Sequence, residues 1–247
     1  MPKISVITVC YNASTTIQET IESVLGQDYS DYEYIIIDGK SSDNTLEVIN
    51  TYKSNAIKLI SEPDSGVYDA MNKGLKIASG DWIYYLNAGD VLCSDSIFTK
   101  VSFYFKNDID VIYGNIILKY KNKSTLAKPL SLDYFPIQFP IFHPGTFVRS
   151  GVIKGYGFDL SYKIAADYNL FYKLYQDLRT FYYIDLNIAI FEAETGLSSS
   201  NRVDLFVECQ RINKRDTFFM FVLKKNVLRF YLLMSKLKIF FSSLFKI

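Results

Sequence analysis

Carboxylate and amide side chains follow three of the apolar segments in the first 90 residues. Tyr11-Asn12 follows the first segment, Asp38 ends the second, and Asn87-Ala88-Gly89-Asp90 follows the fourth. Carboxylates accept hydrogen bonds from ribose hydroxyls and from the N–H groups of a base. They are also the oxygens that hard divalent cations prefer, which makes Asp90 the candidate metal ligand. Any one of these residues alone is more simply a turn former or a helix cap. The whole set, in this order, favours an enzyme acting on a phosphorylated, metal-bound small molecule.

These side chains need a scaffold that brings them together, and the periodicity of the chain predicts one. Strands are expected at residues 4–9, 34–37, 57–60 and 82–86, and helices at 14–26, 44–53 and 66–79. Such alternation of strand and helix implies right-handed crossovers and a parallel sheet. The carboxyl ends of parallel strands share one edge, where α/β folds place ligands.

After residue 95 the pattern loosens. The remaining elements are expected as a helix at 95–106, a strand at 110–118, a polar-to-aromatic stretch at 119–142, a helix at 165–177, a strand at 181–191 and a helical segment at 203–247. A chain of 247 residues that is 49% hydrophobic can bury a substantial core. We therefore predict one domain at 1–202 and a helical extension at 203–247.

The motifs together closely resemble those of the family 2 glycosyltransferases. The resemblance covers about residues 3–200 and is carried by residues 5–12, 37–45, 66–74 and 86–90. It implies the GT-A fold, an α/β Rossmann-like architecture with a mixed, mainly parallel sheet flanked by helices. It also implies transfer with inversion, a nucleotide-sugar donor that is usually UDP-linked, and Mg²⁺ or Mn²⁺ as cofactor.

The resemblance implies a donor site at the strand ends. Tyr11 would lie against the base, Asp38 would bond the uracil, and Asp69 and Asn72 would face the donor pocket. The full set of donor-binding residues that we expect is Val9, Tyr11, Asp38, Asp64, Asp69, Asn72, Lys73, Asn87, Ala88, His143 and Arg202.

At the metal position the chain departs from the family. Relatives usually carry an Asp-x-Asp triplet, and here those two positions are Asn87 and Gly89. Only Asp90 remains acidic, so we assign the metal to Asp90.

The catalytic base is expected at Asp167. Residues 164–170 match the place where the family carries an acidic residue that opens a helix. A carboxylate there can take the proton from an acceptor hydroxyl as its oxygen attacks the anomeric carbon. The alternative is that Asp167 only caps its helix.

Two further segments are weaker candidates. His143 is the only histidine, and relatives show a similar His-x-x-Thr-Phe pattern, which suggests contact with the acceptor or the diphosphate. Residues 198–202 could close over the diphosphate, with Arg202 supplying charge. The alternatives are a structural histidine and an ordinary surface turn.

The charge of the chain is unevenly divided. Residues 217–247 hold six basic and no acidic side chains, whereas the rest carries 21 basic and 26 acidic ones, about −5 in net charge. A helix with an apolar arc opposite Lys225, Arg229 and Lys236 is typical of one that lies in a membrane interface. Its longest apolar run is too short to span a bilayer. The alternative is a helix packed on the domain or on a second subunit, as in a homodimer.

These features predict a partner and a location. Many related enzymes extend a sugar chain on a polyprenyl diphosphate, so we expect a lipid-linked saccharide acceptor from surface polysaccharide synthesis. The three cysteines are far apart and odd in number, and no signal peptide precedes residue 4, which favours the cytoplasmic side of the plasma membrane. The net acidic body gives no support for nucleic-acid binding.

Two other functions stay open from the sequence. One is a membrane-bound scaffold that binds nucleotide sugars with a weakened catalytic site, since the acidic pair is missing at 87 and 89. The other is a sugar nucleotidyltransferase, which would need a Gly-rich, basic loop where the chain has residues 11–14.

Overall fold

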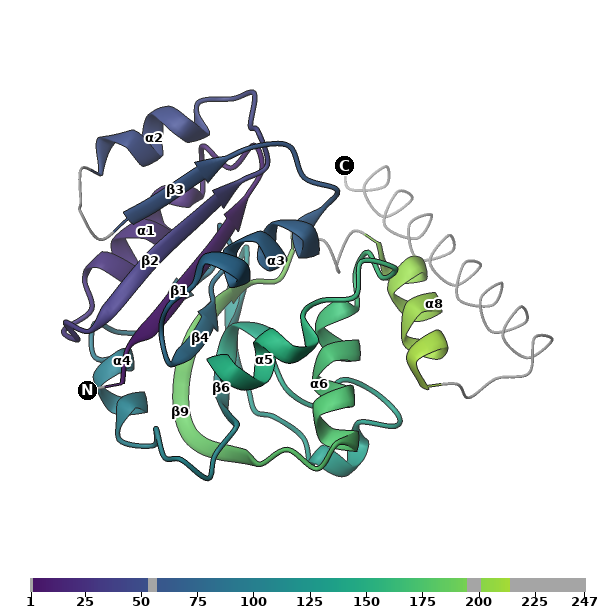
Figure 1. Ribbon diagram of the computed structural model, residues 1–247. Coiled ribbons are helices and arrows are strands. Elements are labelled where there is room, and N and C mark those ends of the chain that lie inside the picture. The colour runs from purple at the N-terminus through teal and green to yellow at the C-terminus, as the bar shows by residue number, and fades with distance from the viewer. Residues whose placement is uncertain (1, 53–56, 195–200, 214–247) are drawn as a thin grey trace, which may run out of the picture.

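The computed structural model describes residues 2–52, 57–194 and 201–213 (Figure 1). Its strands are β1 (Ile4–Cys10), β2 (Tyr32–Asp38), β3 (Ile57–Ser61), β4 (Trp82–Tyr85), β5 (Val91–Leu92), β6 (Val111–Tyr120), β7 (Lys123–Ala127), β8 (Thr146–Arg149) and β9 (Phe181–Glu192). Its α-helices are α1 (Ile17–Leu25), α2 (Thr45–Thr51), α3 (Val67–Ile77), α4 (Ile97–Ser102), α5 (Ser150–Tyr156), α6 (Ala166–Gln176) and α8 (Arg202–Asn213). Two 3₁₀ turns, η1 (Leu132–Tyr134) and η2 (His143–Gly145), lie between β7 and β8.

The strands form one sheet in the order β3-β2-β1-β4-β8-β6-β9-β5, with β7 paired to β6. The first four strands are parallel, as the sequence predicts. β8 runs antiparallel between β4 and β6, and β9 then lies parallel to β6. The sheet is therefore mixed, with its parallel half at the N-terminal side.

Helices cover both faces of this sheet (Figure 1). On one face α1, α2 and α4 pack on side chains such as Val6, Tyr34 and Tyr84. On the other face α3, α5 and α6 pack on side chains such as Ile7 and Ile83. Successive residues of a strand point to opposite faces, so a strand with helices on both sides, such as β1, is buried along its whole length.

The second half departs from the prediction in several elements. The expected helix at 95–106 is shorter, and the polar-to-aromatic stretch at 119–142, for which no element was predicted, contains β7. β5, β8 and α5 were not predicted. β5 and β8 have two and four residues, too few for a periodic pattern to show. α5 carries two glycines, Gly151 and Gly155, which weaken its helical signal.

The helical segment predicted at 203–247 is described only through α8. Ile212 is 6% exposed and belongs to the core on the α3 side of the sheet, with Leu205 and Cys209 packed against it. α8 thus packs on the preceding domain, and we propose that this domain extends through Asn213. Residues 217–247 lie outside the described part. Within the described part, no helix is long and apolar enough to cross a membrane.

Candidate active site

Asp38 joins the ends of three neighbouring strands. The register places Cys10 of β1 and Ser61 of β3 on either side of it. Its Oδ2 accepts from the Ser41 N–H at 3.0 Å and from the Ser61 hydroxyl at 2.6 Å. Its Oδ1 accepts from the Ser41 hydroxyl and from the Cys10 thiol, the latter at 3.7 Å. A carboxylate has about four acceptor sites, so a base that bonds Asp38 must displace one of these donors.

Tyr11 and Asp64 meet over Gly39. The Tyr11 ring is 65% exposed, which leaves an aromatic face open at the strand ends. A Cβ on Gly39 would overlap the Asp64 carboxylate and touch the Tyr11 ring, so a side chain here would push the Asp64 carboxylate aside. Asp64 Oδ1 also accepts from the Gly66 N–H at 2.9 Å. The structure therefore brings a flat ring and a carboxylate together, as a nucleoside site requires.

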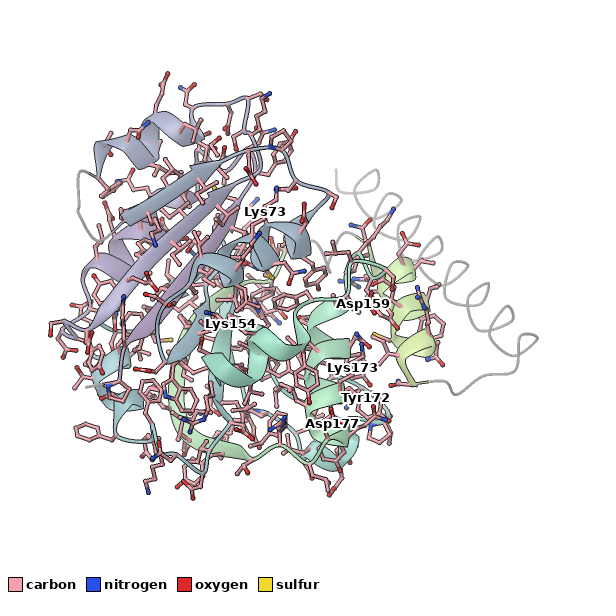
Figure 2. All side chains as sticks on the ribbon, viewed as in Figure 1. Lys73, Lys154, Asp159, Tyr172, Lys173 and Asp177 are labelled. Atoms are coloured by element: carbon pink, nitrogen blue, oxygen red, sulfur yellow. The ribbon has the colours of Figure 1, made fainter. Side chains whose placement is uncertain are left out.

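Asp69 and Lys73 of α3 hold the loop that leads into this helix. Asp69 Oδ2 accepts from the Ser65 N–H at 2.9 Å. Lys73, labelled in Figure 2, donates to the Pro63 carbonyl at 2.6 Å and pairs with Glu62 at 3.0 Å. Both side chains are thus bonded to their own loop, and either would have to leave a partner to contact a diphosphate.

Asn72 forms a two-way bridge across the domain. Its Nδ2 donates to the Phe158 carbonyl and its Oδ1 accepts from the Phe158 N–H, both at 2.8 Å. This pairing uses the amide as a peptide group would, so Asn72 connects α3 to the segment before α6. In this structure Asn72 therefore positions Phe158.

The turn after β4 buries its carboxylate. Gly89 has a φ of 101°, a value that glycine tolerates best, and the Asp90 N–H donates to the Asn87 carbonyl at 3.0 Å. Asp90 is 4% exposed, and its Oδ1 accepts from the Glu192 N–H at 3.3 Å. Burial raises the pKa of Asp90 to about 8. The sequence predicted Asp90 as the metal ligand, and the structure buries this carboxyl.

Asn87 faces the α3 side of the sheet. The Leu86 and Ala88 N–H groups continue the pairing with β1, donating to the carbonyls of Ile7 and Val9. Because strand residues alternate, Asn87 leaves on the same face as Tyr85. Its Oδ1 is buried and has no hydrogen-bond partner among the described residues.

The side-chain oxygens of Asn87 and Asp90 are the candidate ligands for a divalent cation. No three His, Cys, Asp or Glu side chains cluster as ligands within residues 2–52, 57–194 and 201–213. The unpartnered Asn87 Oδ1 and the Asp90 carboxyl are both hard oxygen donors in the same turn. These two residues therefore supply oxygen donors of the kind that a divalent cation prefers, and any such cation would need further ligands from a bound diphosphate.

His143 opens η2 beside the end of β4. Its ring lies 5.6 Å from the Tyr85 ring, and its Nε2 is buried with no hydrogen-bond partner in the described structure. Burial lowers the pKa of His143 to about 4, so the imidazole is neutral at pH 7. A neutral, unpartnered nitrogen can donate to or accept from a ligand.

Asp167 is the second residue of α6 and is half-buried. Its Oδ1 accepts from the Tyr168 N–H at 2.9 Å and lies 3.0 Å from the Tyr68 hydroxyl. Burial raises the pKa of Asp167 to about 6, although these hydrogen bonds act in the opposite direction. A carboxylate with this pKa is ionised at pH 7 and still basic enough to take a proton.

A row of aromatic rings connects Asp167 to the end of β4. Tyr68 stacks on Phe158 at 5.4 Å between ring centroids, and Phe158 meets Tyr85 edge-on at 5.3 Å. Tyr85 in turn contacts His143. No role was predicted for Tyr68 from the sequence, although it lies inside the motif at 66–74.

Two further residues that we expected at the donor site, Val9 and Arg202, are buried in the core and exposed on the surface, respectively. Val9 is buried in the core, and its carbonyl accepts from the Ala88 N–H at 3.2 Å. Arg202 is exposed at the start of α8. The structure thus gathers Tyr11, Asp38 and Asp64 at one end of the sheet edge, and the aromatic row links His143 to Asp167. Neither group includes Arg202.

This architecture is the GT-A fold of glycosyltransferases. Residues 5–165 match the family model described as Glycosyl transferase family 2. The chain belongs to this family, and the predicted fold is confirmed.

Solved structures agree with the fold. The chain aligns to Staphylococcus aureus TarS 1-349 in complex with UDP-GlcNAc with a TM-score of 0.71 and 19% identity, over 85% of this chain and 65% of TarS. It aligns to the mannosyltransferase PcManGT from Pyrobaculum calidifontis, in complex with GDP-Man and Mn²⁺, with a TM-score of 0.68 and 17% identity, over 87% of this chain and 65% of PcManGT. The chain therefore spans less than two thirds of these structures.

Curated relatives share parts of the sequence. A PGL/p-HBAD biosynthesis glycosyltransferase of Mycobacterium tuberculosis is 29% identical over 68% of either chain. The Escherichia coli UDP-Glc:alpha-D-GlcNAc-diphosphoundecaprenol beta-1,3-glucosyltransferase WfgD is 37% identical over 51% of this chain and 49% of its own. The Staphylococcus epidermidis poly-beta-1,6-N-acetyl-D-glucosamine synthase is 36% identical over 54% of this chain and 33% of its own.

Proposed function

We propose that this chain is an inverting glycosyltransferase that moves a hexose or N-acetylhexosamine from a UDP-sugar to a hydroxyl of a lipid-linked saccharide in surface polysaccharide synthesis. The proposal rests on one observation: Asp167 is a half-buried carboxylate whose pKa is raised. The aromatic row connects this side chain to the end of β4. The donor and acceptor classes are supported by the UDP-GlcNAc in TarS and by the substrates in the name of WfgD.

The reaction needs one proton acceptor. Asp167 takes the proton of the acceptor hydroxyl, whose oxygen forms a bond to the anomeric carbon. The bond from that carbon to the diphosphate oxygen breaks, and UDP leaves with the electron pair. Attack from the face opposite the diphosphate inverts the configuration without a covalent intermediate.

Asn87 and Asp90 are the residues that would hold Mg²⁺ or Mn²⁺. When bound, the cation neutralises charge that develops on the departing diphosphate. Tyr11 and Asp64 would contact the nucleoside, and His143 would contact the diphosphate or the acceptor.

A donor screen tests the function directly. Nucleotide release from a panel of nucleotide sugars should be fastest with a UDP-sugar, and Asp167→Asn should abolish most of it. UDP binding should strengthen with Mn²⁺ in the parent protein, and Asp90→Ala should lose this response.

The scaffold alternative predicts a different result. If the protein binds UDP but releases no nucleotide from any sugar donor, the scaffold is favoured. The burial of Asp90 supports this alternative. Membership of a glycosyltransferase family favours sugar transfer over nucleotidyl transfer.

We also propose that residues 217–247 bind the cytoplasmic face of the plasma membrane. Their basic and apolar composition supports this, since each basic residue near an anionic surface adds about 1 kcal/mol. The full chain should pellet with vesicles containing anionic lipid, and a chain lacking residues 217–247 should stay in solution. Equal pelleting of the two would overturn the proposal.

A further inference from the structure

Helix α8 touches the segment that leads into the catalytic helix. Glu208 Oε1 accepts from the Lys163 N–H at 2.7 Å. Its Oε2 accepts from the Ile164 and Ala165 N–H groups, both at 2.9 Å. Three consecutive backbone N–H groups thus converge on one carboxylate, an arrangement that suits an anion.

The position of these N–H groups matters for Asp167. Ala165 is the N-cap of α6, and Asp167 is the second residue of that helix. The N-cap side chain itself makes no capping bond. Glu208 therefore binds, from another helix, the N–H groups of the N-cap residue and of the two residues before it.

Other contacts of α8 support the same segment. The Arg211 guanidinium donates to the Ser161 hydroxyl at 3.0 Å and lies over the Tyr162 ring at 4.6 Å. The Tyr168 hydroxyl donates to Asn213 Oδ1 at 2.6 Å. Asp159, labelled in Figure 2, lies in the same segment before α6 and pairs with Lys173 at 3.8 Å.

We propose that Glu208 is a positioning residue for sugar transfer, whose carboxylate fixes backbone 163–165 and thereby places Asp167 for proton abstraction. This inference rests on the proposed role of Asp167. It assigns a function to α8, which lies beyond the residues that match the family model.

Glu208 has a second, electrostatic effect on the base. Among the described residues, the groups that face Asp167 are Tyr68 of α3, Tyr168 of α6, and Glu208 and Cys209 of α8. Burial is the largest cause of the raised pKa of Asp167, and the negative charge of Glu208 adds to it. Removing this charge should therefore lower the pKa of Asp167.

The test compares Glu208→Gln with Asp204→Asn, which makes the same change on an exposed position of the same helix. A glutamine has one acceptor oxygen and cannot serve all three N–H groups. Misplacement of a catalytic group by about 1 Å costs on the order of 100-fold in rate. We expect kcat to fall by about 10- to 100-fold in Glu208→Gln, UDP affinity to stay within about twofold, and the acidic limb of the pH profile to move to lower pH. Asp204→Asn should match the parent.

Two further variants guard against a loss of folding. Glu208→Asp keeps the charge and should recover part of kcat. Arg211→Met weakens the same segment without removing a negative charge, so it should lower kcat and leave the pH midpoint unchanged. A Glu208→Gln protein with parental kcat and midpoint would overturn the inference. An active Asp167→Asn protein would instead overturn the proposed function.

Discussion

The hydroxyl of Tyr68 lies 3.0 Å from Oδ1 of Asp167 and 2.6 Å from the carbonyl oxygen of Ile164. Burial, followed by the charge of Asp167, raises the pKa of Tyr68 well above its usual value, so the phenol keeps its proton. That single proton is shared between two acceptors. Tyr68 belongs to α3, the helix that carries the expected donor-binding residues, and Asp167 belongs to α6. This hydrogen bond therefore connects α3 with the candidate base.

Asp167→Asn should remove the base and leave the shape of the side chain. General-base catalysis contributes typically about 10²–10⁴-fold, so we expect kcat for UDP release to fall by that amount. UDP affinity should stay near the parental value, because the Asp167 carboxylate bonds to Tyr68 and Tyr168 and, within the described residues, to none of Tyr11, Asp38 and Asp64. Steady-state kinetics combined with calorimetric UDP titration measures both. Parental turnover in this variant would exclude Asp167 as the base.

The pH dependence of the reaction should follow Asp167. The pKa of this acid is raised to about 6, so its ionised fraction, and with it kcat/KM, should rise as the pH increases from 5 to 7. Tyr68→Phe removes a hydrogen bond that favours the ionised form and should move the midpoint to higher pH. Tyr134→Phe, on an exposed tyrosine, is the control. An unchanged midpoint in Tyr68→Phe would show that the hydrogen bond from Tyr68 does not affect the pKa that sets the pH profile.

Gly39→Ala should damage the nucleoside end of the site. The new methyl group overlaps the Asp64 carboxylate and touches the Tyr11 ring. We expect UDP affinity to fall by about tenfold, or 1.4 kcal/mol. Gly151→Ala is the matched control, since a Cβ there meets open space in α5 and should stabilise the helix by about 0.5–1 kcal/mol. Unchanged UDP binding in Gly39→Ala would place the nucleoside elsewhere.

Asn72→Asp should break half of the bridge to Phe158. A carboxylate accepts from the Phe158 N–H but repels its carbonyl oxygen. We expect the free energy of unfolding to fall by about 1–3 kcal/mol, measured by urea denaturation, with a lower kcat because Phe158 packs on Tyr68. Asn50→Asp makes the same change on an exposed position of α2 and should have little effect. Equal stability of the two variants would contradict the bridge.

The β-branched runs and polar strand ends of the first 90 residues predicted the parallel half of the sheet, because β1, β4 and most of β2 are buried on both faces and therefore read as apolar runs. The later half was less predictable. The two-residue β5, the four-residue β8 and the glycine-containing α5 carry little periodicity, and their place depends on pairing with distant strands.

The sequence by itself determined the family, the strand-end motifs and the candidate base, because those depend on residue type and order. Only the tertiary structure decided how each side chain is used. Asp38 is occupied by four donors, Lys73 and Asn72 are bonded to the protein, and Asp90 is buried. Tyr68 and Glu208 reach Asp167 and its backbone from other helices. Such contacts join residues 40–100 positions apart, and the packing of helices on the sheet is what brings them within hydrogen-bond distance.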